Sequence, residues 1–235
     1  IPRQRRFEVD ERIGAHGEEL TPLSDDEIAR VVYDVIAANV DSVAICLLFS
    51  FLEADHEVRI ATRLREVAPE LHVSMSSEVQ PEFREYERMS TTVRNGFLQP
   101  EVSHYMNRLR GELEVRLPKA SIGINQSNGG LMSIEQAASY PIRTALSGPA
   151  AGVIGAVNSA RRSGVGNVIT LDMGGTSAEV CLIRNHEAGI SHEQEVAGFP
   201  IRLPMVDVHT VGAGGGSIAW FDRDGLLKVG PESAG

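Results

Sequence analysis

The first candidate for chemistry is a glycine turn that directly follows an aspartate. Asp172 ends a strand-like run and precedes four residues that could cradle an anion: Gly174, Gly175, Thr176 and Ser177. Glycines let a phosphate approach the main chain, and successive N–H groups in such a turn form an anion nest. An aspartate at a strand end is placed to bind Mg²⁺, directly or through water. The alternative is a plain hairpin turn with Gly-Gly at its tip.

A second glycine cluster lies further along the chain. It consists of Gly212, Gly214, Gly215 and Gly216, with Ser217 directly after them. Four glycines within five residues are costly to order in a strand or helix, so a flexible linker is one explanation. An apolar run at 218–221 follows at once, however, and anchors the loop within the fold. We therefore expect its backbone to lie against a ligand, whether nucleotide phosphate, ribose or substrate.

Two polar residues precede the second cluster. Asp207 and His209 alternate along the expected strand 205–210, so their side chains should project from the same side. Such a pair suits metal binding or general acid–base catalysis. The alternatives are structural: Asp207 orients His209, or both are solvated at a sheet edge.

Upstream, residues 147–149 either direct helix N-terminal amides toward an anion or simply cap the small-residue helix that follows.

The first 80 residues have the pattern of a parallel α/β layer. Residues 3–9 suggest a strand, and residues 24–27 have the sequence of a capping box that starts an amphipathic helix. The continuous apolar run 43–51 predicts a strand covered on both faces. A helix beginning at about Asp55 and a strand at 71–76 complete the alternation of helix and strand.

The middle of the chain has a long helical pattern beginning at Pro81. One stripe at helical spacing is expected to be core: Phe83, Tyr86, Met89, Val93 and Phe97. Pro100 is expected to start a second helix, and 142–146 is expected to be a strand. Composition changes after Pro118, where short strands and glycine turns become frequent. We place a soft domain boundary near residue 80, which divides the chain into domains 1–80 and 81–235.

Composition excludes several classes of protein. The 235 residues include 22 Lys and Arg against 32 Asp and Glu, which gives a net charge of −10. This acidic balance argues against nucleic-acid binding, and 42% apolar residues argue against disorder. No apolar run approaches the length of about 18 residues that a membrane span needs. Cys46 and Cys181 lie in apolar runs, as expected for reduced cysteines of a cytoplasmic protein.

Several motifs, taken in series along the chain, resemble the hydantoinase A / 5-oxoprolinase family. The segments that carry the resemblance are 84–88, 91–95, 127–130, 147–152, 172–177 and 211–217. The family includes subunits of ATP-dependent hydantoin, N-methylhydantoin and 5-oxoproline hydrolases, and the acetone carboxylase subunit is related. Its motif often has Thr-Asp where this chain has Ala178 and Glu179.

The resemblance implies an α/β fold like that of actin, sugar kinases and heat-shock ATPases, a ribonuclease H-like mixed sheet with flanking helices. Residues 172–177 correspond to the family's second phosphate loop, and residues 212–217 to its downstream glycine-rich loop. ATP and Mg²⁺ are then the cofactors, and Asp172 is the metal ligand. Catalytic roles are expected for Asp172, Asp207 and His209. A second metal near Asp207 and His209 is a further possibility.

The implied reaction is phosphorylation of the amide oxygen of a cyclic amide, which makes the ring open to attack by water. A partner subunit or domain of the hydantoinase B type is expected, as is an oligomer. One alternative is the ketone-activating subunit of an acetone-type carboxylase, and another is a nucleotide-binding module without catalysis. The family's first phosphate loop is not among these residues. We therefore expect an internal fragment with an incomplete fold, inactive in isolation.

Overall fold

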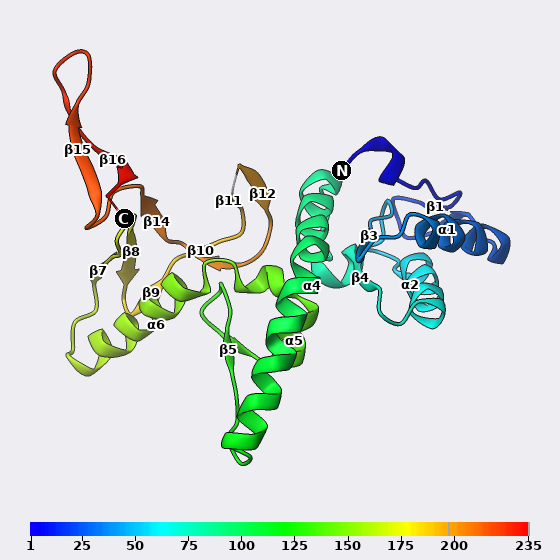
Figure 1. Cartoon of the computed structure of the whole chain (residues 1–235), viewed down its shortest axis with the longest axis horizontal. Helices are drawn as coiled ribbons and strands as arrows, with labels where there is room; N and C mark the ends of the chain where they lie inside the picture. The colour runs from blue at the N-terminus through cyan, green and yellow to red at the C-terminus, as the bar shows by residue number, and fades with distance from the viewer. Residues whose placement is uncertain (197, 235) are drawn as a thin grey trace. The chain divides into compact units, whose positions relative to one another are not determined.

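The structure is a computed structural model that describes residues 1–196 and 198–234. These residues form a mixed α/β fold whose path is drawn in Figure 1. The chain makes two compact units, each assembled from separate stretches. The first unit contains residues 1–124, 133–142 and 193–203, and the second contains residues 125–132, 143–192 and 204 onward. The sequence-based division at residue 80 concerns family domains and stays a prediction.

The first unit is built around the parallel strand pair β3–β4 and the long helix α4. Its elements in order are β1 (Arg12–Ile13), β2 (Glu19–Thr21), α1 (Asp25–Ala37), β3 (Ser42–Ile45), α2 (Asp55–Val67), β4 (His72–Met75), α3 (Ser76–Val79), α4 (Glu85–Arg116), α5 (Ile134–Ser139), β11 (Gln194–Val196) and β12 (Phe199–Ile201). Strands β3 and β4 pair in parallel, which confirms the predicted parallel layer. Pairs β1–β2 and β11–β12 are antiparallel.

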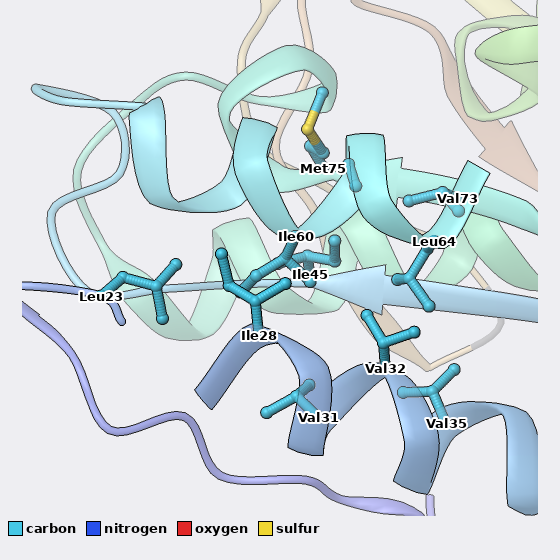
Figure 2. Close-up of a cluster of buried hydrophobic side chains, with 11 residues drawn as sticks. Leu23, Ile28, Val31, Val32, Val35, Ile45, Ile60, Leu64, Val73 and Met75 are labelled. Carbon is cyan, nitrogen blue, oxygen red and sulfur yellow. The ribbon is translucent and has the colours of Figure 1, made fainter. Parts of the chain in front are cut away.

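Helices α1 and α2 pack against this strand pair through an apolar core. Ile28, Val32, Ile60 and Leu64 are buried together with Ile45, as Figure 2 shows. The predicted start of α1 is confirmed in part. The Ser24 hydroxyl accepts a hydrogen bond from the Glu27 amide at 3.1 Å, as predicted. The Glu27 carboxylate, however, accepts a hydrogen bond from the Asp10 amide at 2.7 Å and not from the Ser24 amide.

Three strand predictions fail in whole or in part. Residues 3–9 contain a 3₁₀ helix, Arg3–Arg5, instead of a strand. The expected strand 43–51 ends at Ile45, because the Leu47 amide donates to the buried carboxylate of Glu57 at 2.8 Å and leaves the ladder. The expected strand 142–146 is replaced by a 3₁₀ helix, Pro141–Thr144, whose Ile142 amide donates to the Asn95 side chain at 3.3 Å.

Helix α4 is continuous through Pro100, so the prediction of a new helix at that proline is wrong. The predicted core stripe is also wrong, since Tyr86 and Phe97 are 67% and 79% exposed. The buried face is instead mostly polar: Arg88, Thr91, Thr92, Asn95, Gln99 and Ser103. Most of these groups have hydrogen-bond partners inside the unit, whereas Arg88 Nε has none among the described residues. The Asn95 amide, for example, donates to Ser74 Oγ at 2.9 Å and to the Ser139 carbonyl at 3.0 Å.

Glu57 is the centre of a buried polar cluster beneath α4. The side chain is fully buried, and its carboxylate accepts hydrogen bonds from the Leu47 amide, the Ser76 hydroxyl at 2.7 Å, and the Ser77 amide and hydroxyl at 2.9 and 2.8 Å. Burial, together with the charge of Glu57, raises the pKa of Cys46 to about 12. Cys46 is therefore a thiol at neutral pH, and both cysteines are free, as predicted.

His56 links α2 to the residues around β1 and β2. Its two ring nitrogens lie 2.7 Å from a Glu11 carboxylate oxygen and 2.9 Å from a Glu19 oxygen, and the residue is only 3% exposed. Burial by itself lowers the pKa of His56, but the hydrogen bonds to these two carboxylates outweigh it and raise the pKa above 6.5. Both nitrogens then donate, as they do in an imidazolium.

We expect the free energy of unfolding to fall as the pH rises through the raised pKa of folded His56. A histidine whose folded pKa is raised contributes stability below its unfolded pKa and loses that contribution above its folded pKa. Denaturant titrations between about pH 6 and pH 9 measure this, and His56→Gln should remove much of the slope. His104→Gln, at an exposed position of α4, is the control. Identical slopes in wild type and His56→Gln would refute the assignment.

The second unit is mainly antiparallel. Its elements in order are β5 (Ile124–Asn125), which spans the division, β6 (Leu131–Met132), α6 (Ser147–Arg162), β7 (Val168–Met173), β8 (Ala178–Arg184), β9 (Glu187–Ala188), β10 (Ile190–Ser191), β13 (Met205–Val206), β14 (His209–Val211), β15 (Ser217–Phe221) and β16 (Leu227–Ser233). Strand β8 lies between β14 and β7. Helix α6 covers one face of this sheet through Val153, Val157, Cys181 and Ile183. Among the described residues, no helix is long and apolar enough to cross a membrane.

Candidate functional site

The hairpin β7–β8 places Asp172 at the mouth of a tight loop. The strands pair from Val168 opposite Ile183 to Met173 opposite Ala178. The Gly174 amide then donates to the Ser177 carbonyl at 2.9 Å, which closes the loop 174–177. The predicted succession of strand, glycine turn and strand is confirmed, and the side chain of Asp172 is exposed.

Strand register brings a second carboxylate to Asp172. Asp172 is directly opposite Glu179, and Glu179 is directly opposite Thr210 on β14. Residues directly opposite one another project from the same sheet face. Asp172 and Glu179 both line a cavity of about 270 Å³ between this face and α6. The Ser177 hydroxyl lies 2.6 Å from the Glu179 carboxylate, so it donates to that oxygen.

Helix α6 forms the other wall of this cavity. Pro149, Gly152 and Ala156 line it, and a Cβ on Gly152 would lie 3.8 Å from Asp172 Oδ2. The residue before the helix is Leu146, which has a positive φ of 59° and makes no side-chain cap. The alternative in which Ser147 caps the helix is therefore wrong. The small residues instead keep the helix wall close to Asp172.

The loop has donors that suit an anion. Within the described residues, the amides of Gly175 and Thr176 have no hydrogen-bond acceptor. A Cβ on Gly175 would meet no atom within 4 Å, so the loop tip is open. Mg²⁺ is commonly held by one or two carboxylates while it keeps several waters, and Asp172 with Glu179 can supply them. The described residues contain no cluster of three or more His, Cys, Asp or Glu that forms a metal site.

The second glycine cluster lies against this loop. The Gly215 amide donates to the Gly174 carbonyl at 2.9 Å, and the Gly216 amide donates to the Gly175 carbonyl at 2.7 Å. A Cβ on Gly214 would lie 2.6 Å from Gly174 O. Strand β15 follows the cluster, but residues 218–221 are exposed, so the prediction that this apolar run anchors the loop is wrong, and hydrogen bonds hold the loop instead. The close approach at Gly214 is to the neighbouring loop of the protein.

Asp207 and His209 do not join the cavity. The expected strand 205–210 divides into β13, which pairs with β10, and β14, which pairs with β8, so the two residues do not alternate along one strand. His209 is opposite Val180, on the sheet face away from Glu179 and Asp172. The Asp207 amide donates to the Gly189 carbonyl at 2.8 Å. Burial and the charge of Asp207 raise the pKa of Cys181.

Glu179 lines the cavity, although it is not among the site residues that the sequence predicts. Their spacing predicts the pairing, because Asp172 and Glu179 are equally far in sequence from the centre of the turn. In a two-stranded hairpin this symmetry puts two residues directly opposite each other. The register confirms that arrangement.

Comparison with known proteins places these observations in a family. Residues 88–235, more than half of the chain, match the family model described as hydantoinase/oxoprolinase, and residues 1–68 match the model of its N-terminal region. The whole chain is 36% identical to the caprolactamase subunit alpha of Pseudomonas jessenii and 30% identical to the acetone carboxylase beta subunit of Xanthobacter autotrophicus. Over 89% of its length it is 36% identical to the 5-oxoprolinase of Saccharomyces cerevisiae.

Solved structures agree with the sequence matches. The crystal structure of the ATP-dependent caprolactamase from Pseudomonas jessenii superposes on 100% of the chain with a TM-score of 0.84 and 34% identity. A nucleotide-free acetone carboxylase superposes on 96% with a TM-score of 0.76 and 30% identity. The chain spans about a third of each of these proteins, 34% and 32% respectively. The chain belongs to the hydantoinase/oxoprolinase family.

Proposed function

We propose that this chain is part of an ATP-dependent hydrolase subunit that opens a cyclic amide such as hydantoin, N-methylhydantoin or 5-oxoproline. The observation that carries the proposal is the open loop 174–177, which follows Asp172 closely in the chain and whose Gly175 and Thr176 amides have no acceptor among the described residues. Relatives named caprolactamase and 5-oxoprolinase support the cyclic-amide substrate class. We further propose the actin-like version of the α/β fold, a cytoplasmic location and a partner subunit or domain of the hydantoinase B type.

Each site residue has a role in this proposal. ATP with Mg²⁺ would supply a phosphoryl group to the amide oxygen, which makes the ring carbonyl a better electrophile for water. The Gly175 and Thr176 amides bind phosphate oxygens, and Asp172 holds the cation. The Glu179 carboxylate accepts a hydrogen bond from the Ser177 hydroxyl and thereby orients that hydroxyl in the loop. Asp207 and His209 remain candidates for a second metal or an acid–base role outside this cavity.

The second candidate is the ketone-activating subunit of a carboxylase. The identity of 30% to the acetone carboxylase beta subunit over the whole chain favours it. The same loop would bind the same phosphates, so the two functions differ only in the acceptor of the phosphoryl group. A nucleotide-binding module without catalysis is the third candidate.

An ATP-consumption screen of the full-length protein with its partner separates the candidates. Hydantoins, 5-oxoproline, other lactams, and ketones with bicarbonate are added in turn, and phosphate release is measured. We expect a cyclic amide to stimulate release, with ring-opened product in equal amount. If only ketones with bicarbonate stimulate phosphate release, the chain belongs to a carboxylase subunit. Release that no compound stimulates would favour the binding module.

A further inference from the structure

Most amides of the second glycine loop already have acceptors within the protein. Among its members, the Gly214 amide donates to Ser217 Oγ at 2.8 Å, and the Ser217 amide donates to the Gly214 carbonyl at 3.1 Å. The Ala213 amide donates to the Val211 carbonyl at 2.8 Å, and the amides of Gly215 and Gly216 donate to the first loop. Five consecutive amides, 213–217, therefore have acceptors within the protein. An anion nest needs free amides, and this segment provides none.

The bonds between the two loops act on the peptide units that matter for anion binding. In a trans peptide, the C=O of one residue and the N–H of the next lie in one plane and point in opposite directions. The bond from Gly215 holds the Gly174 carbonyl toward the second loop, so the Gly175 amide points away from it. The bond from Gly216 to the Gly175 carbonyl does the same for the Thr176 amide. Among the described residues, these two amides and the amide of Ser177 are the ones in the loop 174–177 that have no acceptor.

We propose that residues 212–217 form a positioning element that fixes the orientation of two peptide units in the phosphate loop. Gly214 is the residue that allows it. A Cβ there would lie 2.6 Å from Gly174 O and 2.7 Å from Ser177 N, closer than side chains approach backbone atoms. Any larger residue separates the two loops. That the anion is a nucleotide phosphate rests on the proposed function, whereas the positioning geometry does not.

The hairpin β15–β16 holds the positioning element from its other side. The Gly216 carbonyl accepts the Ala234 amide at 2.8 Å and the Ser233 hydroxyl at 3.1 Å. Gly230 has a φ of 70°, and a Cβ there would collide with the Gly212 carbonyl. The Trp220 indole donates to the Gly230 carbonyl at 3.2 Å. The second loop is thus fixed on both sides by backbone contacts, and it has the support that a positioning role requires.

Hydrogen exchange of the nucleotide-free, full-length protein tests the proposal without any turnover. We expect the peptide covering 212–217 to exchange about tenfold or more slowly than an unstructured chain before ATP is added. ATP should then slow exchange at 174–177 and change 212–217 little. Fast exchange at 212–217 that slows only on ATP addition would overturn the positioning role. Protection at 212–217 with no ATP response at 174–177 would support positioning and count against the proposed function.

A matched pair of glycine variants provides the second test. We expect Gly214→Ala to raise the KM for ATP about tenfold, because the Gly175 and Thr176 amides lose their fixed direction. It should also speed exchange at 174–177, although no residue of that segment has changed. Gly155→Ala is the control, since a Cβ at this exposed position of α6 meets no atom within 4 Å. Unchanged KM and exchange in Gly214→Ala would overturn the proposal.

A milder variant covers the case in which Gly214→Ala does not fold. Ser217→Ala removes the hydroxyl that accepts the Gly214 amide and adds no atom to the interface. We expect faster exchange at 174–177 and a KM for ATP raised severalfold, with the far-ultraviolet circular dichroism unchanged. If the exchange at 174–177 and the KM both equal the wild-type values, the positioning role is refuted.

Discussion

Replacing Asp172 with asparagine should lower ATP turnover by the full-length protein about 100-fold or more, because it removes the charge that binds the cation beside the transferred phosphate. The protein should remain folded. Asp172 is exposed, and its side chain makes no hydrogen bond or ion pair with the described residues. Phosphate release at saturating ATP measures the first expectation, and the midpoint of thermal unfolding measures the second.

Asp224→Asn is the matched control for this experiment. Asp224 lies at the exposed tip of the hairpin between β15 and β16, outside the cavity. The same loss of one negative charge should leave turnover at the wild-type value. If Asp172→Asn retained turnover within a few-fold of wild type, the loop 174–177 would not be the phosphate loop.

The largest effect on stability is expected at Glu57. Removal of this side chain in Glu57→Ala leaves four buried or partly buried donors without their acceptor, on Leu47, Ser76 and Ser77. Each buried donor left without an acceptor costs about 1–3 kcal/mol, so together the four should lower the free energy of unfolding by about 3–5 kcal/mol or more. Denaturant unfolding followed by circular dichroism measures the loss.

Two further variants show whether the hydrogen bonds are responsible. Glu57→Gln keeps the shape but replaces one acceptor oxygen with a donor, so it should destabilise less than alanine does. Glu66→Ala removes an exposed carboxylate from the same helix and should change stability by no more than about 0.5 kcal/mol. A loss at Glu57 no larger than the loss at Glu66 would contradict the role of the cluster.

Local sequence signals predicted the elements that carry the site, but not all of their partners. The start of α1, the strands β7 and β8 and the loop between them follow from capping, apolar runs and paired glycines, all of which act over a few residues. The contact between the two glycine clusters depends on the pairing of β14 with β8. The sequence of either cluster alone does not show which one binds a ligand and which one positions the other.

Helix α4 shows the opposite limit of sequence-based prediction. Its periodicity identified a helix correctly and assigned the wrong face to the interior. Apolar side chains are buried by preference, but a polar face can be buried when most of its groups find hydrogen-bond partners. Asn95 and Gln99 find theirs on residues such as Ser74, which belong to distant parts of the sequence. The sequence of the helix does not contain that information.

The interrupted path of the first unit affects the order in which it can be completed during synthesis. Hairpin β11–β12 belongs to the same unit as α4, and the Ser90 hydroxyl donates to the Pro200 carbonyl 110 residues later. At about 5–20 residues per second, the ribosome takes roughly 5–20 seconds to make that stretch. For most of this interval the whole of α4 has been synthesised, while the strands that contact it are still to be translated. A chaperone that binds nascent chains would therefore encounter α4 before hairpin β11–β12 covers the side of the helix that it contacts.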